Sequence, residues 1–274
     1  MLGRAVEELL ILTKTYPTPS TKHRETTCVA ALNSKGEMRR IFPVPFRLLD
    51  GKHQFNKWEW IQGCVSKAKD DNRPESRHID VATIIRTGRR IGTDKGWAER
   101  KRWIAPHIVE DFTALEVHRQ MNGQTLGFLR PSRLLELEIT PVKDPDWTAE
   151  DKAKLLQDGL FDSKEVKARP PLRKLPYDFH YRYECNSANG VEALRHKLTD
   201  WEVGALYWNC YRTHGAQWEK PFRQKLETEF AKKDLLFLMG TVHRFPDQWL
   251  VVGLVYPPKP EPDEETQLSL GLET

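Results

Sequence analysis

Hydrophobic and polar positions alternate along much of the first half of the chain, which is the pattern of strands with one buried face. Residues 7–16 indicate a strand that begins buried and then alternates, and residues 26–46 indicate a hairpin whose tight turn contains Gly36. Further strands are predicted at 55–68 and 77–91. The pattern therefore predicts a strand-rich N-terminal half, either barrel-like or a curved sheet.

Residues 125–142 indicate a bend followed by another strand. Its apolar positions, Leu135, Leu137 and Ile139, are expected on one face, with Glu136 and Glu138 on the other. The two glutamates have no obvious metal-binding neighbours, so we interpret them as part of an exposed sheet face.

Helical periodicity dominates the second half. Thr148 is a cap for a short helix at 149–158, and residues 161–176 form a polar, proline-bearing excursion. Thr199 and Glu202 have the spacing of a capping box, and Gly215 is placed to end that helix. Pro221 then begins another helix, in which the apolar residues Phe222, Leu226 and Phe230 share a face.

Two nearly continuous apolar segments, 234–242 and 248–256, predict a buried hairpin that completes a sheet. The expected class is α+β, with a C-terminal helical pair beside this hairpin, and no internal repeat is visible. We predict four regions: a basic β-rich part at 1–142, a helix and linker at 143–176, an α+β part at 177–257 and a disordered acidic tail at 258–274.

Composition narrows the class of protein. No run of 18 apolar residues occurs, so no membrane-spanning helix is predicted, and the first residues lack the features of a signal peptide. The four cysteines are far apart and form no CxxC pair, which favours buried thiols over a disulfide framework. We therefore expect a cytoplasmic protein.

The small net charge of +4 hides an asymmetry along the chain. Residues 1–133 contain 24 Lys and Arg against 15 Asp and Glu, whereas the remainder contains 19 against 24. A basic half predicts a polyanionic partner, most often nucleic acid, although a basic solvated surface is the alternative.

The densest basic cluster lies at 86–103, where three glycines let a partner approach the backbone and two tryptophans are available for stacking. Arginine predominates, which suits bidentate contacts to phosphate or guanine. The residues predicted to contact nucleic acid here are Arg86, Arg89, Arg90, Lys95, Trp97, Arg100, Lys101 and Arg102. The alternative is a basic loop whose tryptophans belong to the core.

A second basic group surrounds the hairpin at 26–46. Arg39 and Arg40 are adjacent in a strand and must point to opposite faces, so at least one is expected to face solvent. Together with Arg24 and Arg47, they are predicted to contact nucleic acid, or else to form a charged sheet face.

Catalytic signatures are mostly absent. The chain has no P-loop, no dinucleotide-binding glycine motif, no GxSxG and no HExxH. Cys185, His196, Cys210 and His214 have atypical spacing for zinc, and we expect no metal or cofactor. The acid–base candidates are weak and leave the catalytic residues unknown: Asp178, His180, Asp200, Glu202 and His243.

The last residues carry a more specific signal. The segment "QLSLGL", residues 267–272, follows a proline-rich acidic leader and resembles the hexapeptide by which bacterial replication and repair proteins dock onto the DNA sliding clamp. Gln267, Leu268, Leu270 and Leu272 match its glutamine and apolar positions. The resemblance implies that the leucines enter an apolar pocket of the clamp while the glutamine amide fixes the register.

Three hypotheses follow. The first is a bacterial DNA-binding protein that docks to the DNA polymerase sliding clamp, in replication, repair or defence against foreign DNA. The second is a DNA-processing enzyme, a nuclease or a base-processing enzyme, that the clamp only localises. The third is a binding module that does not act on nucleic acid.

Overall fold

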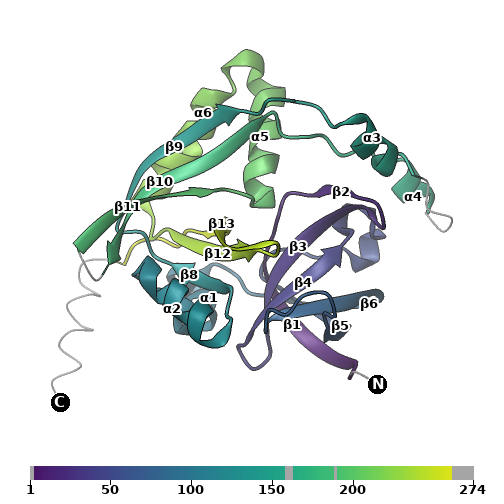
Figure 1. Ribbon diagram of the computed structural model, residues 1–274, viewed down its shortest axis with the longest axis horizontal. Helices are drawn as coiled ribbons and strands as arrows, with labels where there is room; N and C mark the ends of the chain where they lie inside the picture. The colour runs from purple at the N-terminus through teal and green to yellow at the C-terminus, as the bar shows by residue number, and fades with distance from the viewer. Residues whose placement is uncertain (1–2, 158–162, 188–189, 261–274) are drawn as a thin grey trace.

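The computed structural model describes residues 3–157, 163–187 and 190–260. It confirms the predicted α+β class, with a curved, strand-rich N-terminal half and helices in the C-terminal half (Figure 1). Two β-barrels lie side by side, and each is built from one half of the chain.

The first barrel closes because β1 pairs with two different neighbours. Antiparallel pairs join β1 to β3, β3 to β4, β6 to β5 and β5 to β1, while β4 and β6 run parallel. A five-stranded Greek-key barrel with this strand order is an OB fold. Its strands are β1 (Ala5–Lys14), β3 (Arg24–Asn33), β4 (Met38–Val44), β5 (Glu59–Lys67) and β6 (Ser76–Arg90), with the short β2 (Thr18–Ser20) beside β3.

Short helical segments complete this half. Single turns η1 (Phe46–Leu48) and η2 (Gly51–His53) connect the third strand of the barrel to the fourth. After β6 come α1 (Asp94–Ile104) and η3 (Ala105–His107), which lead to the second barrel.

The second barrel repeats the strand order of the first. Strand β10 pairs with β9 and β11, β12 pairs with β8 and β13, and a parallel bridge from Leu198 to Val251 joins the end of β11 to β13. Segments β8 and β9 act as one bent strand, because the Ser132 N–H continues the pairing to Glu184. The strands are β8 (Leu126–Leu129), β9 (Arg133–Pro141), β10 (Tyr177–Ser187), β11 (Gly190–Lys197), β12 (Leu236–Val242) and β13 (Phe245–Val255).

Helices occupy the connections of the second barrel. Strand β7 (Ile108–Val109) and α2 (Phe112–Asn122) precede β8. The connection from β11 to β12 contains the predicted helical pair as α5 (Trp201–His214), turn η4 (Gly215–Gln217) and α6 (Glu219–Arg223), continued by η5 (Gln224–Glu229) and η6 (Phe230–Lys232). As predicted, the side chains of Phe222, Leu226 and Phe230 are buried.

Two features of this architecture differ from the expectation. The repeat of one fold was not visible in the sequence, because a barrel requires alternation and turns rather than any fixed residues. The division between the halves also lies near residue 107 rather than 142, since β8 and β9 pair with strands of the second barrel.

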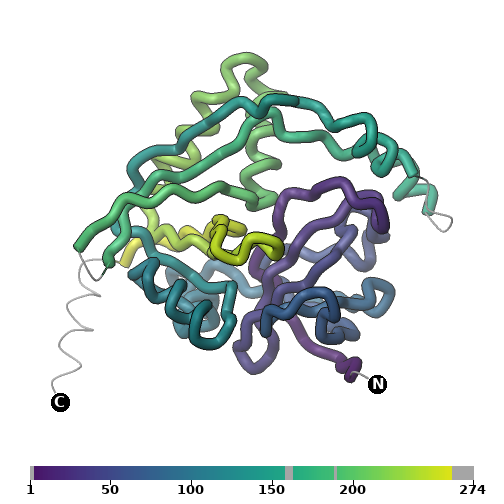
Figure 2. The backbone as a smooth tube through the Cα atoms, viewed as in Figure 1, coloured from purple at the N-terminus to yellow at the C-terminus, as the bar shows by residue number. Residues whose placement is uncertain are grey.

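A long excursion from the second barrel crosses to the first. Residues 142–176 connect β9 to β10 and contain α3 (Ala149–Leu155), capped by Thr148 as predicted, and α4 (Lys164–Lys167) (Figures 1 and 2). Arg47 of the first barrel donates a 2.6 Å hydrogen bond to the Pro170 carbonyl, and the Tyr16 hydroxyl donates to the Arg173 carbonyl at 2.8 Å. We call this segment the arm.

Three apolar clusters hold the molecule together, one inside each barrel and one between them. Leu9 and Ile11 point into the first barrel, whereas Leu10 and Leu12 on the same strand pack against the second. Both faces of β1 are thus buried at residues 9–12, which explains the continuous apolar run there. The second barrel contributes Leu126, Phe128, Leu236, Leu238 and Val252 to this interface.

Two local predictions were wrong for identifiable reasons. Leu135 is exposed because a bulge in β9 places it between the residues that pair with Tyr183 and Arg182. The cap of α5 is Asp200 rather than Thr199, because the Asp200 carboxylate accepts a hydrogen bond from the Glu202 N–H at 2.8 Å. Glu202 therefore has no capping role.

Candidate functional site

Two of the predicted nucleic-acid contacts lie inside the protein. Arg39 and Arg40 are 8% and 3% exposed, so the prediction that at least one faces solvent is wrong. Arg39 pairs with Glu7 at 2.9 Å, and Arg40 donates to the Thr125 carbonyl at 2.9 Å and lies 3.6 Å from Glu75. The causes differ, because adjacent strand residues point to opposite faces. The second barrel, to which Thr125 belongs, covers Arg40, whereas Arg39 is held within the first barrel by Glu7 and by Glu37 at 2.6 Å.

Arg100 is also structural. Its guanidinium lies 4.9 Å from the ring centre of Trp58 and 4.6 Å from that of Trp97, and it donates two hydrogen bonds to the Ile91 carbonyl. The ring of Trp97 in turn packs against Tyr256 of the second barrel. The alternative interpretation, that the tryptophans of this cluster belong to the core, thus describes Trp97 better than base stacking does.

Three more of the predicted cations are half-buried: Arg24, Arg47 and Lys101. Arg47 pairs with the buried Glu25 at 2.8 Å in addition to its bond to the arm. It therefore connects the arm to the first barrel.

The remaining five cations are exposed and follow one another along β6 and α1. Arg86 pairs with Glu59 at 2.6 Å, and Arg89 pairs with Glu8 at 2.9 Å. The other three form no ion pair with any described residue. We call the whole group the β6–α1 cations: Arg86, Arg89, Arg90, Lys95 and Arg102.

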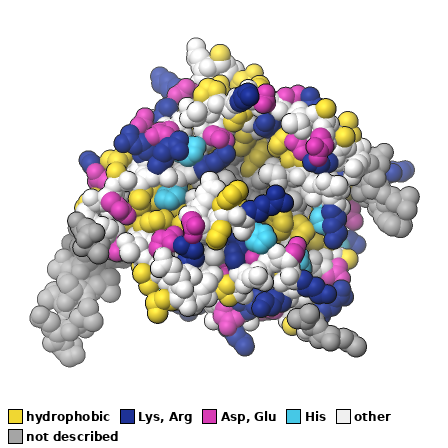
Figure 3. Space-filling model, viewed as in Figure 1, with side chains coloured by type: hydrophobic (Ala, Val, Ile, Leu, Met, Phe, Trp, Pro, Cys, Tyr) yellow, Lys and Arg dark blue, Asp and Glu magenta, His cyan; other side chains and the backbone are white. Residues whose placement is uncertain are grey.

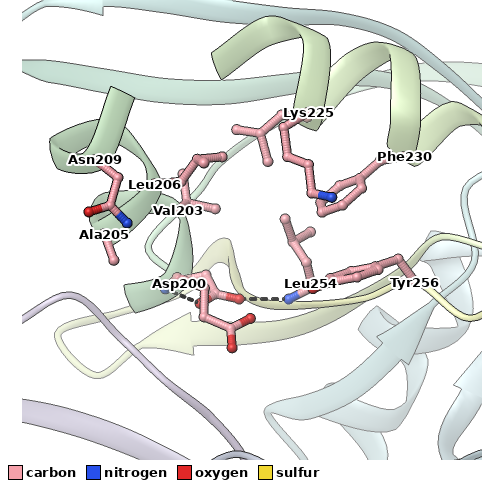
Figure 4. A pocket seen from close by; sticks show the side chains of 11 residues that line it. Asp200, Val203, Ala205, Leu206, Asn209, Lys225, Phe230, Leu254 and Tyr256 are labelled. Atoms are coloured by element: carbon pink, nitrogen blue, oxygen red, sulfur yellow. Dashed lines mark hydrogen bonds between the residues drawn. The ribbon is translucent and has the colours of Figure 1, made fainter. Parts of the chain in front are cut away.

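A cleft opens between the two barrels, beside the last of the β6 arginines. Its polar part has a volume of about 330 Å³ and is lined by Lys14, Phe46, Asn56, Lys57, Arg90 and Trp201, among others. Its apolar part, about 290 Å³, lies between α5 and the turns after α6, where Val203 and Leu206 face Lys225, Phe230 and Tyr256 (Figure 4). Both parts are lined by Asp200, Glu202 and Ala205, so we treat them as one interbarrel cleft.

Asp200 is the buried acid of this cleft. One carboxylate oxygen caps α5, and the other accepts the Leu254 N–H at 2.8 Å and lies 3.9 Å from Lys57 Nζ. Burial raises the pKa of Asp200 to about 6, although Lys57 and the two N–H donors favour its charged form. Both oxygens are already engaged, so the side chain positions α5 and Lys57.

The charge of the Lys57 ammonium is balanced by neighbouring acceptors and carboxylates. Its ammonium donates to the Leu254 carbonyl at 2.7 Å and to the Glu202 carboxylate at 3.1 Å. Burial alone would lower the pKa of Lys57, but Asp200 and Glu202 outweigh burial and raise it. This network attaches the end of the first barrel's η2–β5 loop to the second barrel.

Lys14 differs from Lys57 in having no carboxylate partner among the described residues. Its ammonium donates to the Phe55 carbonyl at 3.0 Å and lies 4.0 Å from the ring centre of Phe46. Burial, aided by the nearby charge of Lys57, lowers the pKa of Lys14 to about 8, against the attraction of the more distant carboxylates of Glu202, Asp200 and Glu59. Sequence reasoning missed Lys14, Lys57 and Trp201, because they come from separate segments and form no motif.

The catalytic and zinc alternatives gain little from the geometry. Asp178 pairs with Lys197 at 2.6 Å, and His196 is hydrogen-bonded to the Tyr183 hydroxyl. Cys185 is buried and donates to the Glu110 carbonyl. Within the described residues, no three His, Cys, Asp or Glu side chains come together as a metal site would require.

Two sequence predictions concern other parts of the chain. Gln267, Leu268, Leu270 and Leu272, the clamp-binding candidates, lie outside the described residues. Among the helices of the described ranges, none has the length and apolar character needed to cross a bilayer.

Comparisons with known proteins divide the chain where the structure does. Residues 5–106 match a family model described as "Domain of unknown function (DUF8758)", and residues 109–273 match one described as "Domain of unknown function (DUF8757)". The boundary falls between η3 and β7, at the passage from one barrel to the other. No curated protein matches the chain.

Several solved structures also match. One is "Structure and Conformational Change of a Replication Protein A Heterotrimer Bound to ssDNA", which has 6% sequence identity and a TM-score of 0.28 and covers 98% of this chain and 69% of that chain. A TM-score of this size carries no argument about fold or function. The assignment of two OB barrels rests on the strand pairings alone.

Proposed function

The chain belongs to the family described as Domain of unknown function (DUF8757), and for this member we propose DNA binding at the β6–α1 cations and the adjoining interbarrel cleft. The observation that carries the proposal is the position of Arg90. It is exposed, has no ion-pair partner among the described residues, and belongs both to the row of cations and to the lining of the cleft.

The side chains around Arg90 are of the types that bind single-stranded nucleic acid. Proteins that hold nucleic-acid strands combine a positive groove for the backbone with aromatic side chains for the bases, and OB barrels are a common scaffold for both. Lys14 and Arg90 supply unpaired positive charge on the cleft wall, while Phe46 and Trp201 supply aromatic surface. The cations before and after Arg90 extend this charge along the outside of the first barrel.

The faces that OB barrels commonly use are less suitable here. On the second and third strands of the first barrel, Ala30, Leu32 and Met38 are buried in the interface with the other barrel. On the second barrel, the equivalent strands β10 and β11 and the neighbouring β9 carry ion pairs. Arg133, Arg182 and Arg195 are each paired with a glutamate there. Basic and acidic side chains are intermixed on the face of the molecule that Figure 3 shows.

A matched pair of triple variants tests the proposal. We expect the intact protein to bind labelled single-stranded DNA, measured by fluorescence anisotropy, with an affinity that falls steeply between ~50 and ~200 mM salt. Substituting Arg90, Lys95 and Arg102 together by Gln should weaken binding about tenfold or more and reduce the salt slope by about 2. Duplex DNA and RNA in the same titration would define the preferred strand.

The control variant removes the same charge from the paired face, through Arg133→Gln, Arg182→Gln and Arg195→Gln. It should retain most of the affinity, because those guanidiniums already have carboxylate partners. Equal losses of affinity in both variants would mean that binding depends on the net charge of the protein and not on the β6–α1 cations. Absence of wild-type binding at low salt would reject the proposal.

The C-terminal peptide extends this proposal. Its support is the resemblance of Gln267–Leu272 to the sliding-clamp hexapeptide, together with the tether of proline and acidic residues before it. Two weak attachments on one tether would raise the effective concentration of the protein at DNA that carries a clamp. A pull-down with the sliding clamp should retain the intact chain and lose the variant Gln267→Ala, Leu270→Ala, and equal retention would remove this part of the proposal.

A further inference from the structure

Lys14 is an unusual group in the described part of the chain. Lys14 is half-buried. A lysine whose ammonium is largely withdrawn from water is normally paired with a carboxylate, because an unpaired charge removed from water is unfavourable. Lys14 reaches only a neutral carbonyl and two aromatic rings, those of Phe46 and Phe55. Its depressed pKa is the expected consequence of that environment. The ammonium therefore forms no direct ion pair with any described carboxylate, although Glu202, Asp200 and Glu59 attract it from farther away.

Two contacts hold the ammonium of Lys14 in a defined position. The hydrogen bond to Phe55 and the contact with the Phe46 ring hold the end of the side chain against the wall of the polar part of the cleft. An ammonium has three N–H donors and only one reaches a hydrogen-bond acceptor among the described residues. Donor capacity therefore remains for a group that enters the cleft.

The charges that line this part of the cleft do not cancel. Lys57 is matched by Asp200 and Glu202, which lie 3.9 and 3.1 Å from its ammonium. Lys14 and Arg90 line the same cavity without any such partner among the described residues. The two carboxylates are thus already engaged by Lys57, and positive charge remains on the side of Lys14 and Arg90.

We propose that the polar part of the interbarrel cleft is a binding site for one phosphate group, held between Lys14 and Arg90. This inference rests on the proposed DNA binding, since the phosphate would belong to a nucleic-acid strand. The sugar or base attached to it would lie against Phe46 and Trp201, whose rings pack edge to face at 5.6 Å. A phosphate provides the negative partner that Lys14 lacks and accepts hydrogen bonds from both cations.

Two sources share this chemistry, the phosphate at a strand end and a phosphate within the backbone. Oligonucleotides of one sequence with a 5′-phosphate, a 3′-phosphate or no terminal phosphate separate them. Dependence of affinity on one terminal phosphate would identify a strand end. Equal affinity of all three, still dependent on Lys14, would identify a backbone phosphate.

The test compares wild type with Lys14→Met, and with Lys35→Met as the matched control. Lys35 is an exposed lysine of the same barrel, in the β3–β4 turn, outside the cleft. Calorimetric titration with the three oligonucleotides at pH 7 should show affinity at least about tenfold lower for Lys14→Met and nearly unchanged for Lys35→Met. Lys14→Gln, a second neutral variant, should behave as Lys14→Met does.

The pH dependence gives a readout that a structural role of Lys14 would not produce. The charged groups that act on Lys14 are Lys57 of the η2–β5 loop, Glu59 of β5, and Asp200 and Glu202 at the start of α5. Binding of phosphate requires the protonated amine, so wild-type affinity should fall as pH rises from 7 to 9, through the range in which Lys14 loses its proton. The two neutral variants should lack this part of the decline. On the wild type itself, bound oligonucleotide should protect Lys14 from an amine-acylating reagent, as mapped by mass spectrometry.

The outcomes separate the two proposals. If wild type binds no nucleic acid at low salt, the proposed function and this inference both fail. If wild type binds but Lys14→Met and Lys14→Gln bind equally well, with the same pH dependence and no protection of Lys14, only the phosphate site is overturned.

Discussion

The two barrels have one strand order but very different connections. In the first barrel, residues 15–23 join the first two strands, and two single turns, η1 and η2, lie between the third and fourth. In the second barrel, the same two positions carry the 35-residue arm and the helices α5 and α6. The added segments do not cover the second barrel alone, since the arm crosses to the first barrel and α5 forms a wall of the cleft.

This difference shows how the site is divided between the halves. In the polar part of the cleft, the first barrel supplies the cations Lys14, Lys57 and Arg90, and the second supplies the acids Asp200 and Glu202. Each half adds one aromatic side chain, Phe46 from the first and Trp201 from the second. Neither half contains the cleft by itself. The comparison also separates two groups of surface arginines: Arg133, Arg182 and Arg195 on the second barrel have glutamate partners, whereas Arg90 and Arg102 have none among the described residues.

The largest effect should come from the interface that joins the barrels. Phe128 of the second barrel is fully buried in it, so Phe128→Ala should reduce the free energy of unfolding by about 3–5 kcal/mol. Phe245→Ala, at an exposed position of the same barrel, should cost less than about 1 kcal/mol. Urea denaturation measures both, and similar losses would mean that the barrels do not depend on each other for stability.

The two cleft lysines should respond to substitution in opposite directions. Lys57→Met should lower stability at pH 7 by about 3 kcal/mol, because it leaves buried Asp200 without its cation. Lys14→Met should instead raise stability at pH 7, by at most roughly 3 kcal/mol at about 1.4 kcal/mol per pKa unit. The gain should be smaller than this limit, because the substitution also removes the cation–π interactions of the ammonium with Phe46 and Phe55.

The pH profile decides whether charge is the cause. The pKa of Lys14 is lowered in the folded state, so its cost is fully present below pH 8 and disappears as pH rises toward 10.5. The advantage of Lys14→Met over wild type should therefore shrink across that range. A constant advantage in thermal or urea denaturation would attribute the effect to packing.

The smallest effect is expected on the ion-paired face of the second barrel. Arg182 is exposed and lies 3.4 Å from Glu136 and 3.6 Å from Glu138, so Arg182→Gln should cost less than about 1 kcal/mol. The loss should decrease further at high salt, because exposed pairs are screened. A loss above about 2 kcal/mol in urea denaturation would show that this face is a structural element comparable to the interface.

Local pattern predicted much of the fold. The hairpin at 26–46, the helix capped by Thr148 and the buried face of Phe222, Leu226 and Phe230 all form as expected. Each depends on neighbours within a few residues, which a sequence displays directly. The α+β class followed from the same local signals.

The site was less accessible to sequence reasoning. Arg39 and Arg40 have the signature of a basic strand. Docking of the second barrel covers Arg40, and distant Glu7 together with Glu37 holds Arg39. Lys14, Lys57 and Trp201 are brought together by barrel closure and by the packing of α5, across nearly two hundred positions of sequence. Arg89 and Arg90 are exposed, as a contact with nucleic acid requires, and the contact itself stays a prediction. Their exposure is understandable because a dense charged cluster cannot be buried as a whole.

The buried face of β1 has one more consequence. Leu10 and Leu12 fix the second barrel directly on the wall of the first, and the arm attaches to the first barrel from the other side through Pro170 and Arg173. A strand that reached from the β6–α1 cations into the cleft would thus meet a site whose width is fixed by the packing of the two barrels, rather than one that closes around its ligand. The nucleic-acid strand would therefore have to change its conformation to fit the cleft, and strands too stiff to do so would bind weakly.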